Sequence, residues 1–270
     1  MKIMFRLSYW VLCIILLSTS VFAKTVVGEI KTGEYEVNPV HSYNPFPYKT
    51  AQEYFDNLQK VDLQLGNEES FRDLPKLGMK KPYTGYITLG DKPQKFGVIV
   101  DIYGQEKRLY IDTDGDGSFA GEPMVVLLNE WQGMQVYWVV APEPIQLKVT
   151  YDSAGGKTFP IQISVSGLLN PTGVVIKEKP YLRINVRTWF LVKINEAGYE
   201  KYGAIVDFNN NGRFNDPQDR FFLDYNNNRF FNPNEAIIIK KGVNLKSGKS
   251  KTTLDWQAYP EKVIVGGDKR

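Results

Sequence analysis

Three short segments of this 270-residue chain carry oxygen-bearing side chains at every second position. Each begins with Asp at position 1, has Asp or Asn at positions 3 and 5, and has Phe at position 8. Calcium takes about six to eight oxygen ligands, which a tightly curled loop supplies from alternate side chains and from the backbone carbonyl at position 7. A glycine at position 6 permits the sharp turn. The segments are residues 112–119 (DTDGDGSF), 207–214 (DFNNNGRF) and 224–231 (DYNNNRFF).

The first segment is the most acidic of the three. Three carboxylates within five residues repel one another unless a cation lies among them. Position 9 is Ala120 and position 12 is Pro123, so we expect the late carboxylate to come from the neighbouring residue 122. The candidate metal ligands are Asp112, Asp114, Asp116, Ser118 through its carbonyl, and Glu122.

The second segment offers amides at positions 3 and 5, which attract a cation through a dipole and not through a full charge. Position 12 is Gln218, and Asp216 and Asp219 lie nearby in the sequence. The candidate ligands are Asp207, Asn209, Asn211, Arg213 through its carbonyl, and Asn215.

The third segment has an acid at position 12 but Arg229 at position 6. Because Arg tolerates a positive φ poorly, we expect Asn227 or Asn228 to make the turn. The candidate ligands are Asp224, Asn226, Asn228 and Glu235. Asp-Gly and Asn-Gly are also strong hairpin turn formers, so metal-free turns are the alternative interpretation of all three segments.

The segments resemble the short Asp-x-Asp-x-Asp-Gly calcium loops of EF-hands, bacterial dockerins and thrombospondin type 3 repeats. They are most similar to the hairpin loops of integrin-type β-propellers, because strands are predicted on either side of them. The resemblance covers about a dozen residues at each site, and the remaining chain suggests no family. It implies calcium ligands at positions 1, 3, 5 and 7, with a further oxygen from position 9 or 12.

Strand patterns dominate the chain from about residue 83. Apolar and polar residues alternate over 145–151, 161–165 and 182–187, and residues 90–93 separate two further strands with turn chemistry. The sequence therefore predicts an all-β fold, an antiparallel sandwich or barrel. A capping box at Thr50 and Glu53 predicts a short N-terminal helix near 51–60. Prolines at 39, 45 and 47 suggest that residues 24–49 are extended and irregular.

An internal repeat suggests two related β units. Residues 96–101 (FGVIVD) match 202–207 (YGAIVD), and residues 109–112 (LYID) match 221–224 (FFLD). We predict an N-terminal segment over 24–82, a first β unit over 83–165 with the first calcium loop, and a second over 180–265 with the other two.

The first 23 residues have the features of a signal peptide. Lys2 and Arg6 precede an apolar stretch, and Ala23 is a small residue that suits cleavage. We expect an exported protein (periplasmic, on the cell surface or extracellular) with no transmembrane segment after cleavage. Cys13 would leave with the peptide, so no disulfide would brace the mature chain.

Composition excludes several functions. Lys and Arg number 33 against 30 Asp and Glu, so the charge is too balanced for a nucleic-acid partner. One histidine and one cysteine disfavour a zinc site or a Ser-His-Asp triad. We name no catalytic residues and favour a non-enzymatic role.

The leading hypothesis is therefore a calcium-binding protein of a bacterial cell envelope or secretome, structural or adhesive, with a polysaccharide or envelope protein as partner. The alternative is a carbohydrate-binding module or a small carbohydrate-active hydrolase, which requires at least two exposed aromatic side chains on a concave sheet face. The tryptophans considered for such a platform are Trp131, Trp138, Trp189 and Trp256.

Overall fold

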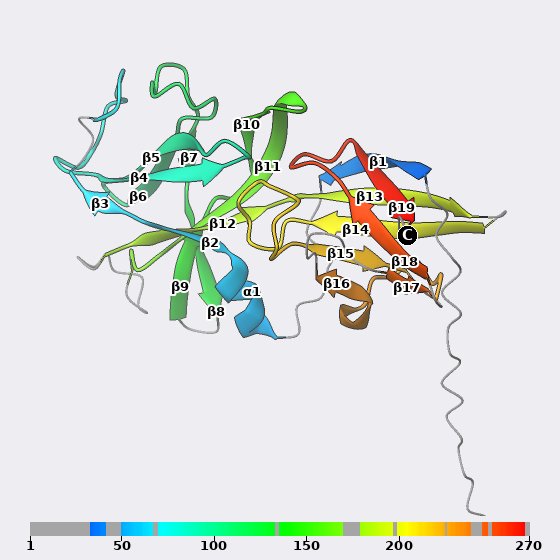
Figure 1. Cartoon of the computed structure of the whole chain (residues 1–270). Helices are drawn as coiled ribbons and strands as arrows, with labels where there is room; N and C mark the ends of the chain where they lie inside the picture. Colours follow the sequence, from blue (N-terminus) through cyan, green and yellow to red (C-terminus); the bar gives the residue numbers. More distant parts are fainter. Residues whose placement is uncertain are drawn as a thin grey trace, which may run out of the picture.

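A computed structural model describes residues 33–41, 50–66, 70–132, 135–169, 179–196, 199–224, 226–238, 245–247 and 250–267. The predicted signal peptide, 1–23, lies outside these residues. The described residues form an all-β fold of three antiparallel sheets with one short α-helix, as the alternation predicted (Figure 1). In this part of the chain, no helix is both long and apolar enough to span a bilayer.

The largest sheet has eight strands in the order β16-β15-β14-β13-β1-β19-β18-β17. They are β1 (Gly33–His41), β13 (Thr188–Glu196), β14 (Tyr199–Val206), β15 (Arg220–Leu223), β16 (Ala236–Ile238), β17 (Leu245–Ser247), β18 (Ser250–Asp255) and β19 (Lys262–Gly267). A 3₁₀ turn, η2 (Pro233–Glu235), precedes β16.

The other two sheets have six and five strands. The six-stranded sheet has the order β2-β12-β11-β9-β8, with β10 paired to β11. Its strands are β2 (Gln59–Asp62), β8 (Leu128–Gln132), β9 (Gln135–Val140), β10 (Ile145–Tyr151), β11 (Gly155–Ser166) and β12 (Tyr181–Val186). The five-stranded sheet, β3-β4-β5-β6-β7, contains β3 (Gln64–Leu65), β4 (Tyr83–Leu89), β5 (Gln94–Tyr103), β6 (Glu106–Ile111) and β7 (Met124–Val126).

One hydrophobic core joins the three sheets. Along β10 every second residue is buried, and β11 and β12 likewise turn Ile163 and Ile184 inward. These side chains share a cluster with Phe96 of β5 and Phe190 of β13. Because each sheet contributes one apolar face, none of them buries its core residues alone.

Within the segment 24–49, which the prolines led us to expect to be irregular, the described residues 33–41 form a regular strand, β1; the rest of that segment lies outside the described residues. Strand β1 contains Pro39 and lies in the middle of the largest sheet. Its first half, 33–36, pairs with β19, and its second half, 37–41, pairs with β13. Among the described residues Pro39 therefore has a paired strand on one side only, and a strand in that position tolerates a missing N–H.

Helix α1 (Ala51–Asn57) begins where the capping pattern predicted. The Thr50 hydroxyl accepts a hydrogen bond from the Glu53 amide at 3.0 Å. The helix ends at Asn57, and β2 begins two residues later. It lies beside the six-stranded sheet (Figure 1).

The two repeated segments form two hairpins in different sheets. In the first, β5 and β6 are joined by the tight turn at residues 104–105. In the second, β14 and β15 pair in the same way, but residues 207–219 lie between them. Strand β12 lies in the predicted second β unit, which begins at residue 180. It pairs, however, with β11 and β2 of the six-stranded sheet.

Residues 207–219, here termed the junction loop, contact all three sheets. The Gly90 amide, in the β4–β5 turn, donates to the Asn211 carbonyl at 3.0 Å, and the Val186 amide at the end of β12 donates to Asn210 Oδ1 at 2.8 Å. The Phe214 amide donates at 2.9 Å to the carbonyl of Ala258, between β18 and β19. The loop therefore ties together elements that are far apart in the sequence.

The side chain of Asn210 links the junction loop to two other elements, the end of β12 and the end of α1. Asn210 is 1% exposed with a φ of 56°, and its Nδ2 donates to the Asn57 carbonyl at the end of α1 at 2.9 Å. Two residues later, Gly212 has a φ of 74°, which favours glycine. A Cβ at this position would also lie only 3.1 Å from Leu89 Cβ.

We predict that Asn210→Ala destabilises the protein by about 2 kcal/mol or more beyond a matched control, because it leaves the Val186 amide and the Asn57 carbonyl without their partner. The control is Asn227→Ala, which removes an exposed side chain from a backbone with the same φ of 56°. Urea unfolding of both variants measures the difference. Equal losses would mean that backbone strain alone matters at position 210.

Candidate metal centre

The three predicted loops follow the ends of β6, β14 and β15 and share a pattern of positive φ values. Positions 4 and 6 have positive φ in each: Gly115 and Gly117, Asn210 and Gly212, Asn227 and Arg229. Asn227 makes the turn that we expected in the third loop, but Arg229 also has a φ of 63°. The expectation that Arg229 would avoid this region is therefore wrong, since the loop geometry overrides the preference of the side chain.

A common set of hydrogen bonds accompanies this conformation. The position 1 carboxylate accepts bonds from the amides of positions 5 and 6, at 3.2 and 2.9 Å for Asp112. Asp207 and Asp224 accept the same two bonds in their loops. The position 5 side chain then accepts from the amide of position 7, as Asp116 does from Ser118 at 2.7 Å. Through these bonds, the backbone amides of each loop fix the position of the side chains at positions 1 and 5.

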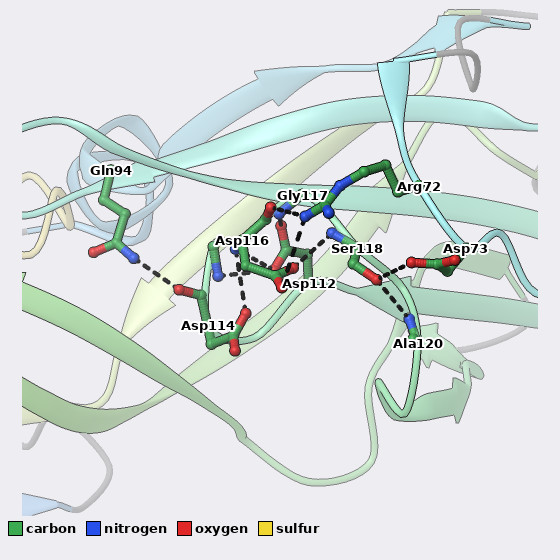
Figure 2. Close-up of polar contacts among 10 residues, drawn as sticks. Arg72, Asp73, Gln94, Asp112, Asp114, Asp116, Gly117, Ser118 and Ala120 are labelled. Atoms are coloured by element: carbon green, nitrogen blue, oxygen red, sulfur yellow. Dashed lines mark hydrogen bonds and ion pairs between the residues drawn. The ribbon is translucent and has the colours of Figure 1, made fainter.

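The first loop brings together a cluster of carboxylates. Asp112, Asp114 and Glu122 each place one oxygen within 4.8 Å of the others, so this acid cluster could hold a metal ion. Figure 2 shows Asp112 at the centre of the loop, with Asp114 and Asp116 beside it. Thr113 donates its hydroxyl hydrogen to Glu122 at 2.6 Å and fixes that carboxylate next to the loop.

The electrostatics of the acid cluster favour a cation. Burial raises the pKa of Asp112, although its backbone hydrogen bonds act in the opposite direction. Asp116 is turned toward Arg72, whose Nη2 lies 3.8 Å from its carboxylate and donates to its carbonyl at 2.6 Å (Figure 2). The Ser118 hydroxyl donates to Asp73 at 2.7 Å. One guanidinium therefore faces Asp116, while Asp112, Asp114 and Glu122 converge.

The junction loop gathers a different acid set. The carboxylate of Asp219 accepts from the amides of Phe208 at 2.9 Å and Asp216 at 2.7 Å. Asn209 and Asn211, the predicted ligands at positions 3 and 5, both direct their Nδ2 atoms to Asp216 Oδ2. Among the residues that the structure describes, the buried Oδ1 atom of Asn209 has no hydrogen-bond partner, so this oxygen can accept a further bond.

Two aspartates of the junction loop are almost fully buried. Asp207 is 2% exposed and Asp219 is 0% exposed. Burial raises the pKa of both carboxyls, and each is raised further by the charge of a neighbouring aspartate. Arg213 Nη1 reaches Asp216 at 3.5 Å, and its Nη2 donates to Asn215 Oδ1 at 3.5 Å.

The third loop is the most exposed. Asn226 and Asn228 face solvent, while Asp224 is buried. Glu235, the predicted ligand at position 12, instead accepts from the Asn232 amide at 2.8 Å and from Asn232 Nδ2 at 3.2 Å, which caps η2. The structure thus gives the Glu235 carboxylate a local structural partner.

The phenylalanine at position 8 anchors each loop. Phe119 is 5% exposed and packs on Phe71, and Phe214 is 0% exposed in the main core. Phe231 is half-buried against Phe222 and Trp189. The anchoring therefore weakens from the junction loop to the third loop.

Sequence reasoning did not include Asp219 or Asp73 among the site residues. Asp219 is twelve residues after Asp207, one place beyond the usual late ligand, and only its burial beside Asp207 reveals it. Asp73 comes from a distant segment that the Arg72–Ser118 bridge brings to the first loop, and no local pattern marks it.

Comparisons with known proteins add no relative: no family model, no curated protein and no solved structure matches this chain.

The buried aspartates predict how the metal-free protein depends on pH. Because their pKa values are raised on folding, the native state binds more protons than the unfolded state above about pH 4. With chelator present, the free energy of unfolding should therefore fall as the pH rises from 5 toward 9; Asp112 contributes with the same sign. Urea unfolding across this range measures the slope, and Asp219→Asn should flatten it. A stability that rises with pH would contradict the assignment.

Proposed function

We propose that this is an exported calcium-binding β-protein with a structural or adhesive role, in which calcium braces the loops at the strand ends. The observation that carries the proposal is the acid cluster of Asp112, Asp114 and Glu122, set in a loop whose conformation recurs twice. A turn needs no such convergence of negative charge, because a backbone hairpin is stable without it.

The ligand chemistry favours calcium over other cations. Carboxylates, amide oxygens and backbone carbonyls on curled loops are hard, flexible donors, which suit calcium at about 2.3–2.6 Å. Zinc and copper prefer imidazole or thiolate ligands, and the loops contain neither histidine nor cysteine. Magnesium demands nearly ideal octahedral geometry and retains several waters.

A cation in the junction loop would offset the cost of two buried carboxylates. An uncompensated carboxylate is costly to bury, and Asp207 and Asp219 are both buried near Asp216. A divalent ion among them would lower the free energy of the charged forms and satisfy Asn209 Oδ1. Since this loop contacts all three sheets, an ion there would stabilise the whole fold in place of disulfides.

We expect calcium to stabilise the protein. An ion that binds only the native state adds about 2.7 kcal/mol at 100 times its dissociation constant. Affinity should be on the order of 10⁻⁴ to 10⁻³ M, as in extracellular modules. The melting temperature should therefore rise between chelator and millimolar calcium, and calorimetric titration should give heat. An unchanged melting temperature, together with no heat, would refute calcium binding.

A matched pair of variants assigns the effect to the acid cluster. Asp112→Asn should remove part of the calcium-dependent stabilisation, because it deletes the central charge of the cluster. The control is Asp101→Asn. Asp101 is 0% exposed and occupies the repeat position equivalent to Asp207. It accepts hydrogen bonds at 2.8 Å from the amides of Gly78 and Met79, whereas Asp207 accepts from amides of its own loop. The loss of stability in Asp101→Asn should be the same with and without calcium. An equal calcium increment in both variants would exclude the first loop as a site.

A further inference from the structure

A groove on the outer face of the six-stranded sheet lies beside α1. Its volume is about 640 Å³, within the range of small-ligand sites. One wall is aromatic and consists of Tyr54 and Phe55 from the helix and Trp138 from β9. The floor is polar, with Gln162 and Ser164 from β11, whose neighbours Ile161 and Ile163 point to the core.

Strand register explains why these side chains share one face. Leu128 pairs with Val140, Val140 with Ser164, and Ser164 with Arg183. Directly paired residues point to the same side of a sheet, so this row crosses four strands on the groove side. Lys60 of β2 continues the row beyond Arg183 but lies outside the groove.

Arg183 is held in the groove by aromatic rings. Its guanidinium carbon lies 5.0 Å from the ring centroid of Phe55, 5.9 Å from that of Trp138 and 5.3 Å from that of Tyr181. Its Nη2 donates to the Tyr181 hydroxyl at 3.0 Å. These contacts fix the guanidinium plane without neutralising its charge.

The groove is short of negative charge. Its lining contains Arg183 and Arg187 against one carboxylate, Glu130, which is exposed. Among the described residues, no ion pair includes Arg183. A neutral ligand that covered this guanidinium would offer it only uncharged acceptors, whereas a carboxylate would form stronger, charge-assisted hydrogen bonds and balance its charge.

We propose that this groove binds an acidic saccharide, with a uronate carboxylate on Arg183 and a sugar ring face against Trp138. Aromatic rings offer the apolar surface on which the C–H face of a sugar ring packs. Gln162, Ser164 and Asn129 provide polar groups for hydroxyls along the floor. Of the other tryptophans considered, Trp256 is buried in the core, Trp189 packs on Phe231, and the side chain of Trp131 lies outside the description.

The site is separate from the calcium loops, because none of its lining residues belongs to them. The two proposals can therefore fail independently. The junction loop does contact the end of α1 through Asn210, so binding should be measured in constant millimolar calcium.

The test uses trigalacturonate and its fully methyl-esterified form, in which each carboxylate is replaced by a neutral methyl ester. Calorimetry and tryptophan fluorescence of the full chain should show uronate binding, with the ester at least about tenfold weaker. Arg183→Gln should weaken uronate binding at least about tenfold, and Arg183→Lys should fall between it and the wild type because it keeps the charge but not the planar donor fork. The control is Lys60→Gln. It removes the same charge one strand away, from an exposed side chain that pairs with Asp62, and should bind uronate like the wild type.

Three outcomes would overturn the proposal. They are no binding of either saccharide, equal binding of acid and ester, or equal losses in Arg183→Gln and Lys60→Gln. The comparison of acid and ester needs only the wild type, so a misfolded variant would not prevent the decision.

Discussion

The placement of two carboxylates, Asp207 and Asp219, in the interior is the constraint on which the rest of the structure depends. Both are almost completely buried in the junction loop, and burial together with neighbouring negative charge raises their pKa values. The same loop accepts hydrogen bonds from the amide of Gly90 in the β4–β5 turn and, through Asn210 Oδ1, from the amide of Val186 at the end of β12. It donates one from Phe214 to the carbonyl of Ala258, between β18 and β19. Polar bonds between the three sheets therefore run through this loop, in addition to the shared hydrophobic core. No basic side chain among the described residues is buried there to balance the two carboxylates, and a divalent cation would supply that charge.

The three loops show how one local conformation serves different surroundings. All share the positive φ values and the carboxylate-to-amide bonds. The first is partly open and concentrates acids, the junction loop is enclosed, and the third is exposed with Glu235 engaged in a cap. The loop with the most acidic residues, which the sequence shows, is therefore not the loop with the most contacts to the rest of the fold, because those contacts depend on what packs around each loop.

Much of the fold could be predicted from the sequence, because its determinants are local. Alternation located β10, β11 and β12, and Thr50 located the start of α1. The reasoning failed at Pro39 because a distant partner decides the outcome there: β1 changes from β19 to β13 just before it. It failed at Arg229 for a local reason, since the loop conformation overrides the preference of the side chain for negative φ. The meeting of Glu122 with Asp112 follows from short spacing, whereas the burial of Asp219 and the groove around Arg183 depend on which strands pair.

Amide hydrogen exchange measured by NMR, with and without calcium, tests the central claim most directly. If a cation in the junction loop secures the three sheets, chelation should accelerate exchange outside the loop, at the amides of Gly90 and Val186, together with exchange at Phe214, whose amide bonds from the loop to Ala258. Exchange that is unchanged by chelation, or that accelerates only within residues 207–219, would contradict the account.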